Sequence, residues 1–307
     1  MAEALDAPYI RIVTDAPRHA RLDSRALVRV GGPDWRSFLQ GLLTQDVDSL
    51  VEGELRFGAL LTPQGRLLHD LFVLGQSDGA LLDVAATGRE AIIARLSMYR
   101  LRAKVEIVAD RRPVSALFHA SASTEGGTPG GNAVVSAAGR AVGVAGTPGF
   151  HEDPRLPALG LRGYGAIVPE AAVETDEAAY DAHRLSLGVP ATADWGEEKT
   201  WPIDADFDLL NGIDFRKGCF VGQETTSRMK RRGQIRNRML PIRFDGPPPA
   251  KGAEVLAGEL RAGEVLSGID GRGMALLRLD RVTGADLAVE GRPVHVEIPA
   301  WMQNPLA

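Results

Sequence analysis

The chain has 307 residues, of which 44% are hydrophobic and 24% charged, and its formal net charge is −5. This length and composition are typical of a folded protein of two or three domains and exclude large-scale disorder. No apolar run approaches the roughly 20 residues that span a bilayer, and no basic and apolar signal segment opens the chain. A single cysteine cannot form an internal disulfide. We therefore expect a cytoplasmic protein without a membrane segment.

The first third of the chain alternates predicted strands with predicted helices. Alternating apolar residues indicate strands, and apolar residues three and four apart indicate helices that pack one face inward. Residues 62–65 form a hairpin-like turn between two of the strands. This order of elements is typical of an α+β domain. The predicted strands are 25–30, 55–61, 67–74 and 101–107, and the predicted helices are 35–43 and 90–100.

The rest of the chain divides into a second mixed region and a region of short strands. Serine, glycine, threonine and proline predict a loop at 121–131. Short apolar runs separated by glycine-rich and proline-rich turns, from Leu240 to Ile298, predict a small antiparallel β-barrel. The other predicted elements are strand-like runs starting at Val134 and Val142, an extended segment at 153–165, a strand at 166–168 and a capped helix at 175–187.

The stretch from Asp214 to Arg238 is the part of the chain that packing alone does not explain, because it offers no continuous apolar face. It contains the only cysteine, Cys219, between two glycines. Glycine adopts positive φ without steric cost, so we expect a tight turn with Cys219 at the bend. Nearby cations such as Lys217 favour the thiolate, which is the reactive and metal-binding form of cysteine. Free cysteines are also common as small buried hydrophobes, and that alternative stays open.

Charge is concentrated in the same stretch. Eight basic residues lie between Arg216 and Arg238 against one acid, Glu224, which is a local charge of +7 in an acidic chain. Such a patch normally has an anionic partner, and phosphate, a polyglutamate tail and RNA all qualify. A merely solvated surface is the alternative. Gln223 and Glu224 could orient a ligand by hydrogen bonds.

One cysteine also limits metal chemistry. An iron–sulfur cluster usually needs four thiolates, and structural zinc needs four cysteine or histidine ligands. The six histidines are scattered without short metal-ligand spacing. We therefore predict no resident metal site, and any cluster that Cys219 touches takes its other ligands from a partner, a second subunit or a small thiol.

The run Lys-Gly-Cys-Phe-Val-Gly-Gln-Glu from Lys217 to Glu224, followed by Thr226, Arg228 and Arg232, resembles the signature of the YgfZ-type folate-binding proteins. These proteins are relatives of the glycine-cleavage T-protein (aminomethyltransferase) and support iron–sulfur cluster assembly or repair. The resemblance implies an α+β, T-protein-like fold with two α+β parts around a central cavity and a C-terminal β-barrel. The corresponding parts are residues 1–110, which bind folate, 111–238, which carry the motif, and 239–307, the barrel.

The resemblance also implies a site. Tetrahydrofolate or a derivative is the expected cofactor, and Cys219, Lys217, Gln223 and Glu224 are the expected reactive group. The expected partners are iron–sulfur enzymes or assembly proteins, with the chain as a monomer. The expected folate contacts are Tyr180, Arg25, Asp70 and Arg228.

Two of these folate contacts, Tyr180 and Asp70, can be weighed further. Tyr180 and Arg184 are four residues apart in a predicted helix and share a face that suits a flat ligand such as a pterin. A tyrosine closing the core is the alternative. Asp70 forms part of a His-Asp pair where the T-protein has two carboxylates, and it could instead serve only as a hydrogen-bond partner near a strand end. Ser186 stands where many relatives carry a carboxylate.

Three functions therefore compete. The first is a folate-binding accessory protein for iron–sulfur cluster assembly or repair, which the signature favours. The second is a folate-dependent aminomethyltransferase, against which the His69-Asp70 replacement speaks. The third is an RNA-binding or tRNA-modification factor, for which Phe215 and Phe220 offer little stacking surface, so that a nucleic-acid partner is not expected. Whether the chain catalyses a reaction stays open.

Overall fold

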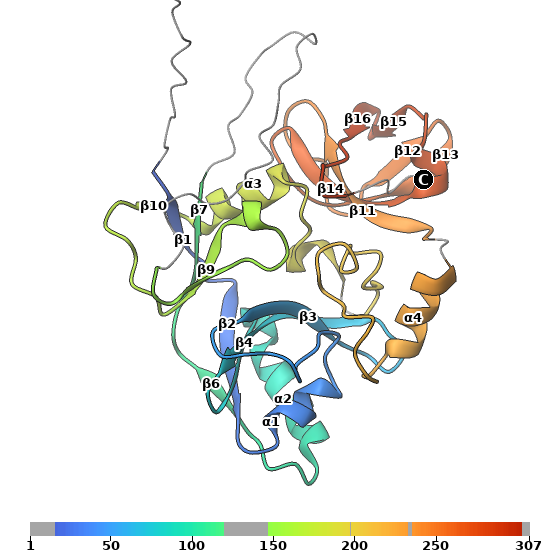
Figure 1. Cartoon of the computed structure of the whole chain (residues 1–307). Coiled ribbons are helices and arrows are strands. Elements are labelled where there is room, and N and C mark those ends of the chain that lie inside the picture. The colour runs from blue at the N-terminus through green and yellow to red at the C-terminus, as the bar shows by residue number, and fades with distance from the viewer. Residues whose placement is uncertain (1–15, 120–146, 197, 233–234, 303–307) are drawn as a thin grey trace, which may run out of the picture.

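The computed structural model describes residues 16–119, 147–196, 198–232 and 235–302. Two five-stranded sheets and a closed six-stranded barrel form its frame, and the barrel lies at one end (Figure 1). Among the described residues no helix is both long and apolar enough to cross a membrane. The loop predicted at 121–131 and the strand-like runs predicted to start at Val134 and Val142 lie outside the described residues. The other predicted elements can be compared directly with the structure.

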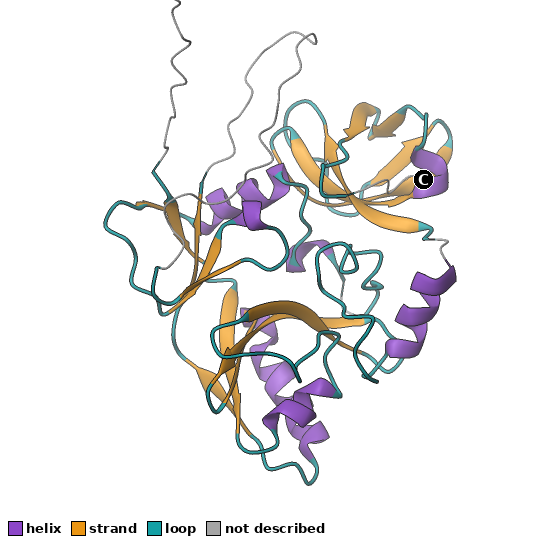
Figure 2. Ribbon diagram, in the orientation of Figure 1, coloured by secondary structure: helices purple, strands orange, loops and turns teal. Residues whose placement is uncertain are grey.

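The first sheet is antiparallel throughout, and both of its faces are buried. Helices α1 and α2 cover one face, where Val28, Leu71 and Val73 point into one apolar cluster (Figure 2). Leu27 and Phe72 point to the opposite face and a second cluster, which explains the nearly continuous apolar strands. The strand order is β3 (Leu55–Leu61), β4 (Leu67–Gln76), β5 (Gly79–Ala85), β2 (Arg25–Gly31) and β6 (Glu106–Asp110), and the helices are α1 (Trp35–Gln40) and α2 (Arg89–Arg100).

The second sheet combines strands from distant parts of the chain. Strand β1, near the N-terminus, pairs antiparallel with β7 and parallel with β10. Helix α3 (Glu177–Ser186) packs beside it, and the Asp176 carboxylate caps this helix by accepting a 2.9 Å hydrogen bond from the Ala179 N–H. The strand order is β10 (Val173–Thr175), β1 (Arg18–Arg21), β7 (Val114–Phe118), β9 (Leu161–Tyr164) and β8 (Phe150–Glu152). Strand β1 lies within the range 1–110, and the three-part division of the chain stays a prediction.

The predicted C-terminal barrel is confirmed. Its strands close into a ring with its own apolar core. The order is β11 (Asn237–Arg243), β14 (Arg272–Arg278), β13 (Leu260–Ile269), β12 (Glu254–Ala257), β15 (Leu287–Val289) and β16 (Arg292–Val296). The remaining helical segments are η1 (Ala86–Gly88), η2 (Pro157–Leu159), η3 (Thr192–Asp194), α4 (Gln223–Arg232) and α5 (Leu279–Val282).

Two predicted strands are misplaced. The strand predicted at 101–107 begins only at Glu106, because Leu101 ends α2 with a φ of 42° and residues up to 105 form the connection. The strand predicted at 166–168 is instead β9, at Leu161–Tyr164, within the segment predicted to be merely extended. Gly165 ends it with a φ of 64°. The helix predicted over 35–43 ends at Gln40, although Leu42 and Leu43 are buried as expected.

A buried ionic cluster joins the barrel to the rest of the molecule. Arg238, on β11, donates to Asp206 at 2.8 Å and to both carboxylate oxygens of Asp208 at 3.0 Å. The Arg238 guanidinium also donates to the Ile203 carbonyl at 3.0 Å. Asp204 belongs to the same loop, and its backbone carbonyl accepts from the Met239 N–H at 2.7 Å. The loop and the first barrel strand are therefore held as one unit.

Asp204 makes stability depend on pH. Burial raises the pKa of its carboxyl to about 7 from a usual value of 3.8. Between these two values the unfolded chain releases the proton and the folded chain keeps it, so stability falls as pH rises and the loss is complete above pH 7. From pH 5 to pH 8 we expect the free energy of unfolding of the wild type to fall by about 3 kcal/mol more than that of Asp204→Asn.

Urea unfolding of both proteins at the two pH values measures this difference. Asp280→Asn is the matched control, because the pKa of the exposed Asp280 lies below 3.8 and this carboxylate stays ionised across the range. Identical pH profiles for wild type and Asp204→Asn would contradict the assignment.

Candidate functional site

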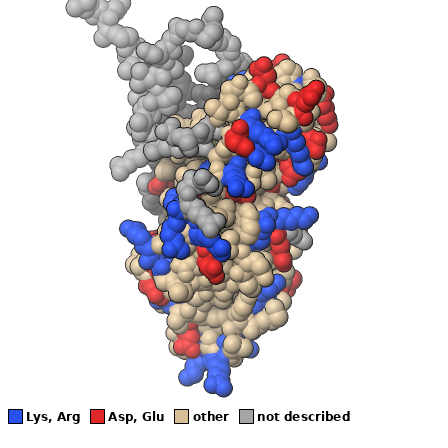
Figure 3. All heavy atoms as spheres, turned by 90° about the vertical axis from the view of Figure 1, so that its right-hand side faces the viewer, with Lys and Arg blue, Asp and Glu red and all other residues tan. Residues whose placement is uncertain are grey.

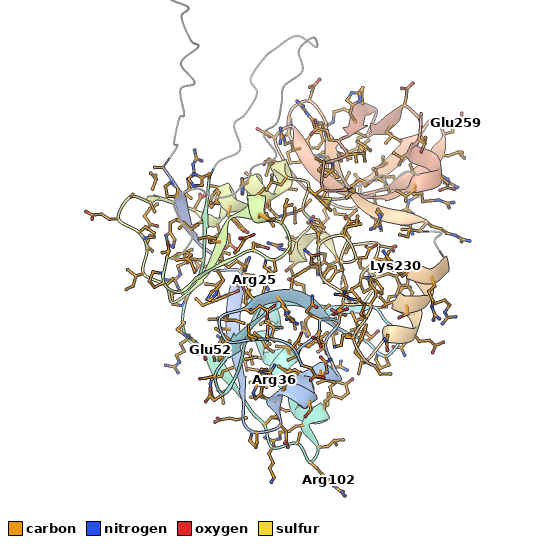
Figure 4. All side chains as sticks on the ribbon, in the orientation of Figure 1. Arg25, Arg36, Glu52, Arg102, Lys230 and Glu259 are labelled. Atoms are coloured by element: carbon orange, nitrogen blue, oxygen red, sulfur yellow. The ribbon has the colours of Figure 1, made fainter. Side chains whose placement is uncertain are left out.

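A cavity of about 530 Å³ opens between the first sheet and α3. This volume lies within the range of small-molecule sites. Its wall includes the end of β2, the middle of β4, one face of α3 and the η3 turn. Figure 4 shows Arg25 at this place, reaching from the first sheet toward the second. Three of the four predicted folate contacts, Arg25, Asp70 and Tyr180, line this cavity.

Asp70 lies at the cavity wall with both carboxylate oxygens engaged. One oxygen accepts from an Arg25 Nη at 2.8 Å, and the other accepts from the Thr192 hydroxyl at 2.8 Å. The same Arg25 nitrogen donates to the Thr192 hydroxyl oxygen at 3.1 Å. Asp70 is only 4% exposed, so these three side chains form a closed polar group rather than a free acid.

Behind this group, Asp83 is fully buried and gathers two arginines. Its carboxylate accepts from Arg25 Nε at 2.7 Å, from Arg162 at 2.6 Å and from the Tyr164 hydroxyl at 3.2 Å. Burial alone would raise the pKa of Asp83, but the two guanidinium groups lower it below its usual value. The Asp83 carboxylate thereby balances the positive charge of Arg25 and Arg162, and both of these arginines line the cavity.

The Phe72 ring, only 1% exposed, lies beneath two arginines of the cavity wall. Arg162 lies 3.9 Å and Arg155 4.9 Å from the centre of the Phe72 ring. Arg155 is itself paired with the buried Asp153, at 2.8 Å. The buried ring thus supports the guanidinium planes of Arg155 and Arg162, and both of these residues line the cavity.

Helix α3 contributes two polar atoms that have no partner among the described residues, the Tyr180 hydroxyl and one Nη of Arg184. Both side chains are buried, with exposed fractions of 7% and 2%. Burial, followed by the nearby charge of Asp153, raises the pKa of Tyr180, so its hydroxyl keeps its proton. Tyr180 also packs against Phe118, with 5.3 Å between ring centres, and therefore serves the core as well as the cavity.

The signature segment lies elsewhere, between α1 and α4. Gly222 has a φ of 81°, and a side chain there would approach the Thr62 carbonyl within 2.7 Å, so only glycine fits. The turn lies at residues 221–222, after the cysteine, and Gly218 has no positive φ, so the prediction that Cys219 sits at the bend is wrong. Cys219 is exposed, which removes the alternative of a buried packing residue.

Lys217 holds this segment in place. Its ammonium donates to the carbonyls of Gln40, Leu43 and Gln45 at 2.6 to 2.8 Å. Burial lowers the pKa of Lys217 to about 8 although the carboxylates of Asp46 and Asp48 oppose the shift. All three N–H donors are used on the last residue of α1 and the loop that follows it, so Lys217 positions the backbone beside Cys219 rather than donating to its sulfur.

The other signature residues begin α4. Glu224 and Arg228 form an exposed pair at 3.2 Å, one helical turn apart, and Gln223 precedes them. None of these residues, and neither Cys219 nor Lys217, lines the cavity. The structure thus forms two groups, one in the cavity and one around Cys219, and Arg228 lies with the second rather than with the predicted folate contacts.

The basic patch is smaller than its sequence suggests. Lys217 and Arg238 are buried with structural partners, and the side chain of Arg232 lies outside the described residues. Figure 3 shows Lys and Arg side chains on the barrel and across the region below it. Lys230 points from α4 toward the loop of Asp208, 3.7 Å away (Figure 4). The exposed members are Arg216, Arg228, Lys230, Arg231 and Arg236.

Sequence reasoning missed Asp83, Arg155, Arg162 and Thr192. Asp83 left a signal, because a single carboxylate interrupts the apolar strand β5 and a buried acid needs a cationic partner. The other three come from loops or short strands whose spacing carries no periodic pattern.

Comparisons with known proteins agree with this architecture. Residues 236–304 match the family model described as CAF17, C-terminal beta-barrel domain. The solved structure of glycine cleavage system aminomethyltransferase T from Bartonella henselae superimposes with a TM-score of 0.70, at 19% identity over 93% of this chain and 86% of that one. The predicted T-protein-like α+β fold is therefore confirmed.

Sequence relatives give the family. A mitochondrial iron-sulfur cluster assembly factor IBA57 homolog of Neurospora crassa is 33% identical over 75% of this chain, but the match spans only 54% of that protein. The Pyricularia oryzae homolog is 32% identical over 89% of this chain and 74% of its own length. The Mus musculus IBA57 is 30% identical over 90% and 80%.

The names of these relatives correct one prediction. They are described as mitochondrial, which contradicts the cytoplasmic location inferred from the single cysteine and the absence of a signal segment. A reduced thiol is compatible with more than one compartment, so the cysteine count did not decide between them. The narrower YgfZ assignment stays a prediction. From the identities and lengths matched, the chain belongs to the IBA57 family of iron–sulfur cluster assembly factors.

Proposed function

We propose that this chain supports iron–sulfur cluster assembly with two separate sites. A tetrahydrofolate binds in the cavity beside α3, and Cys219 contributes one thiolate at the surface next to α4. The observation that carries the proposal is the cavity itself, because two of the residues that line it, Tyr180 and Arg184, each carry a buried polar atom without a partner among the described residues. Family membership supplies the link to cluster assembly.

The residues of the cavity fit a folate. A pterin ring is flat, and the guanidinium planes of Arg155 and Arg162, which line the cavity, offer it a matching surface. Tyr180 and Arg184 supply hydrogen-bond donors, and Arg25 and Asp70 form a fixed polar edge. When bound, a tetrahydrofolate would supply a carrier for a one-carbon unit.

Cys219 fits the handling of a cluster as cargo. Its thiol is exposed, and the Lys217 ammonium fixes the adjoining backbone, so the sulfur is presented at a defined place. Because this is the only cysteine, the remaining ligands of a cluster must come from a partner. The exposed cations Arg216 and Arg228 favour a partner with an acidic surface around its own ligands.

Folate binding is tested by blocking the cavity. Ala178 is exposed and lines the cavity, so Ala178→Trp fills it without disturbing the core. Ala94→Trp is the matched control, because Ala94 is also exposed, on α2, and lies outside the cavity. By anaerobic titration calorimetry with tetrahydrofolate we expect wild type and Ala94→Trp to bind alike and Ala178→Trp to bind at least about tenfold more weakly. Equal binding by Ala178→Trp would place the folate elsewhere, and no binding by wild type would refute the folate part of the proposal.

A further inference from the structure

We propose that Tyr180 and Arg184 act as a donor pair that recognises a neutral carbonyl oxygen on the ring of the cavity's ligand. On the proposed function, on which this inference rests, that atom is the 4-oxo group of the pterin. Arg184 thereby becomes a specificity-determining residue, and the cavity selects an oxo group over an amino group at this ring position.

The two residues are placed for a shared task. They are four apart on α3, so their side chains lie on one face of the helix, and both line the cavity. The hydroxyl of Tyr180 and one Nη of Arg184 are buried polar atoms without a partner among the described residues. A buried donor without a partner is costly, so a ligand that brings an acceptor to both is favoured.

The remaining nitrogens of Arg184 fix its orientation. Its Nε donates to Asp181 at 2.6 Å. One Nη donates to Asp194 at 2.8 Å and to the Val189 carbonyl at 3.0 Å. The other Nη is therefore held in a defined direction before any ligand arrives, and a preorganised donor discriminates better than a mobile one.

Charge decides which acceptor fits. Arg184 already faces two carboxylates, Asp181 and Asp194. The other arginines of the wall are paired in the same way, Arg25 and Arg162 with Asp83 and Arg155 with Asp153. Little positive charge is left to balance an anionic ligand group deep in the cavity, whereas a neutral carbonyl oxygen needs none. The carboxylates of a glutamate tail are thus directed away from this pair.

The test compares ligands that differ in one group. Tetrahydrofolate carries the 4-oxo group, and its 4-amino counterpart, reduced aminopterin, presents a donor at that place. By anaerobic calorimetry we expect wild type to bind the oxo compound about 30-fold more tightly. In Tyr180→Phe combined with Arg184→Lys this ratio falls to about threefold or less, since both donors are lost while a cation still faces Asp194. Each single variant gives an intermediate ratio.

The ratio is measured within one protein, so a loss of general stability does not change it, and circular dichroism checks that each variant is folded. Tetrahydropteroate, which lacks the glutamate tail, completes the set. If wild type binds tetrahydropteroate much more weakly than tetrahydrofolate, and the double variant does not, the pair binds a carboxylate of the glutamate tail. This result would overturn the inference. Equal binding of the oxo and amino compounds by wild type would overturn it while leaving the folate proposal intact, and no binding of either by wild type would refute both. An unchanged ratio in the double variant would refute the assignment to these residues.

Discussion

Cys219→Ala is expected to reduce the rescue of an iron–sulfur enzyme to the level of an empty vector, with protein abundance unchanged. The loss follows because this is the chain's only thiol, and neighbouring oxygen and nitrogen groups do not replace a soft cluster ligand. The fold should tolerate the change, since the side chain is exposed. The measurement is the activity of an iron–sulfur enzyme in a strain that lacks its own family member, with expression levels matched.

Two further variants sharpen this experiment. Cys219→Ser keeps the size of the side chain and is expected to fail like alanine, which separates sulfur chemistry from shape. Glu259→Ala changes an exposed residue at the far edge of the barrel (Figure 4) and should rescue like wild type. Full rescue by Cys219→Ala would leave folate binding, rather than the thiol, as the basis of the activity.

Arg238→Met is expected to lower the free energy of unfolding by about 3–5 kcal/mol, the usual cost of removing one partner of a buried ion pair. Asp208, which is almost fully buried, would lose both of its 3.0 Å hydrogen bonds from the guanidinium. Because Arg238 lies on β11, the loss should fall on the junction between barrel and body. Chemical denaturation followed by tryptophan fluorescence measures it.

The control for this variant lies on the same strand. Arg243 pairs with Glu297 at 3.0 Å, but both side chains are about half exposed, so Arg243→Met should cost less than about 1 kcal/mol. Equal losses for the two variants would mean that the buried cluster adds nothing beyond an ordinary surface pair.

Regular patterning in the sequence was enough to predict most of the architecture. Strands β2, β3 and β4 and helices α2 and α3 follow directly from the spacing of their apolar residues, and the barrel follows from short runs between glycine turns. The errors at β6 and β9 arise where a single residue with positive φ, Leu101 or Gly165, changes the direction of the backbone and so shifts the strand boundary. Such a change of direction depends on tertiary contacts, which the spacing of apolar residues in the sequence does not reveal.

The site was less accessible to sequence reasoning. The Cys219 segment could be singled out because it lacks the continuous apolar face of a core element. Its surface charge was overestimated, because Lys217 and Arg238 are buried and bound to partners inside the protein. The cavity depends on residues brought together from β5, β9 and the η3 turn, far apart in the chain. Among them only Asp83 disturbs a pattern strongly enough to be noticed.

The position of β1 has a consequence for the order in which the protein is made. This strand pairs with β7 and β10, yet the whole first sheet lies between β1 and β7 in the chain. The ends of that inserted unit meet, because the Leu22 N–H donates to the Val114 carbonyl at 2.9 Å. On a ribosome the strands of the first sheet can therefore pair early, whereas β1 finds β7 only after residue 118 has emerged and β10 only after Thr175. The face of the first sheet that packs against Phe207 is covered later still.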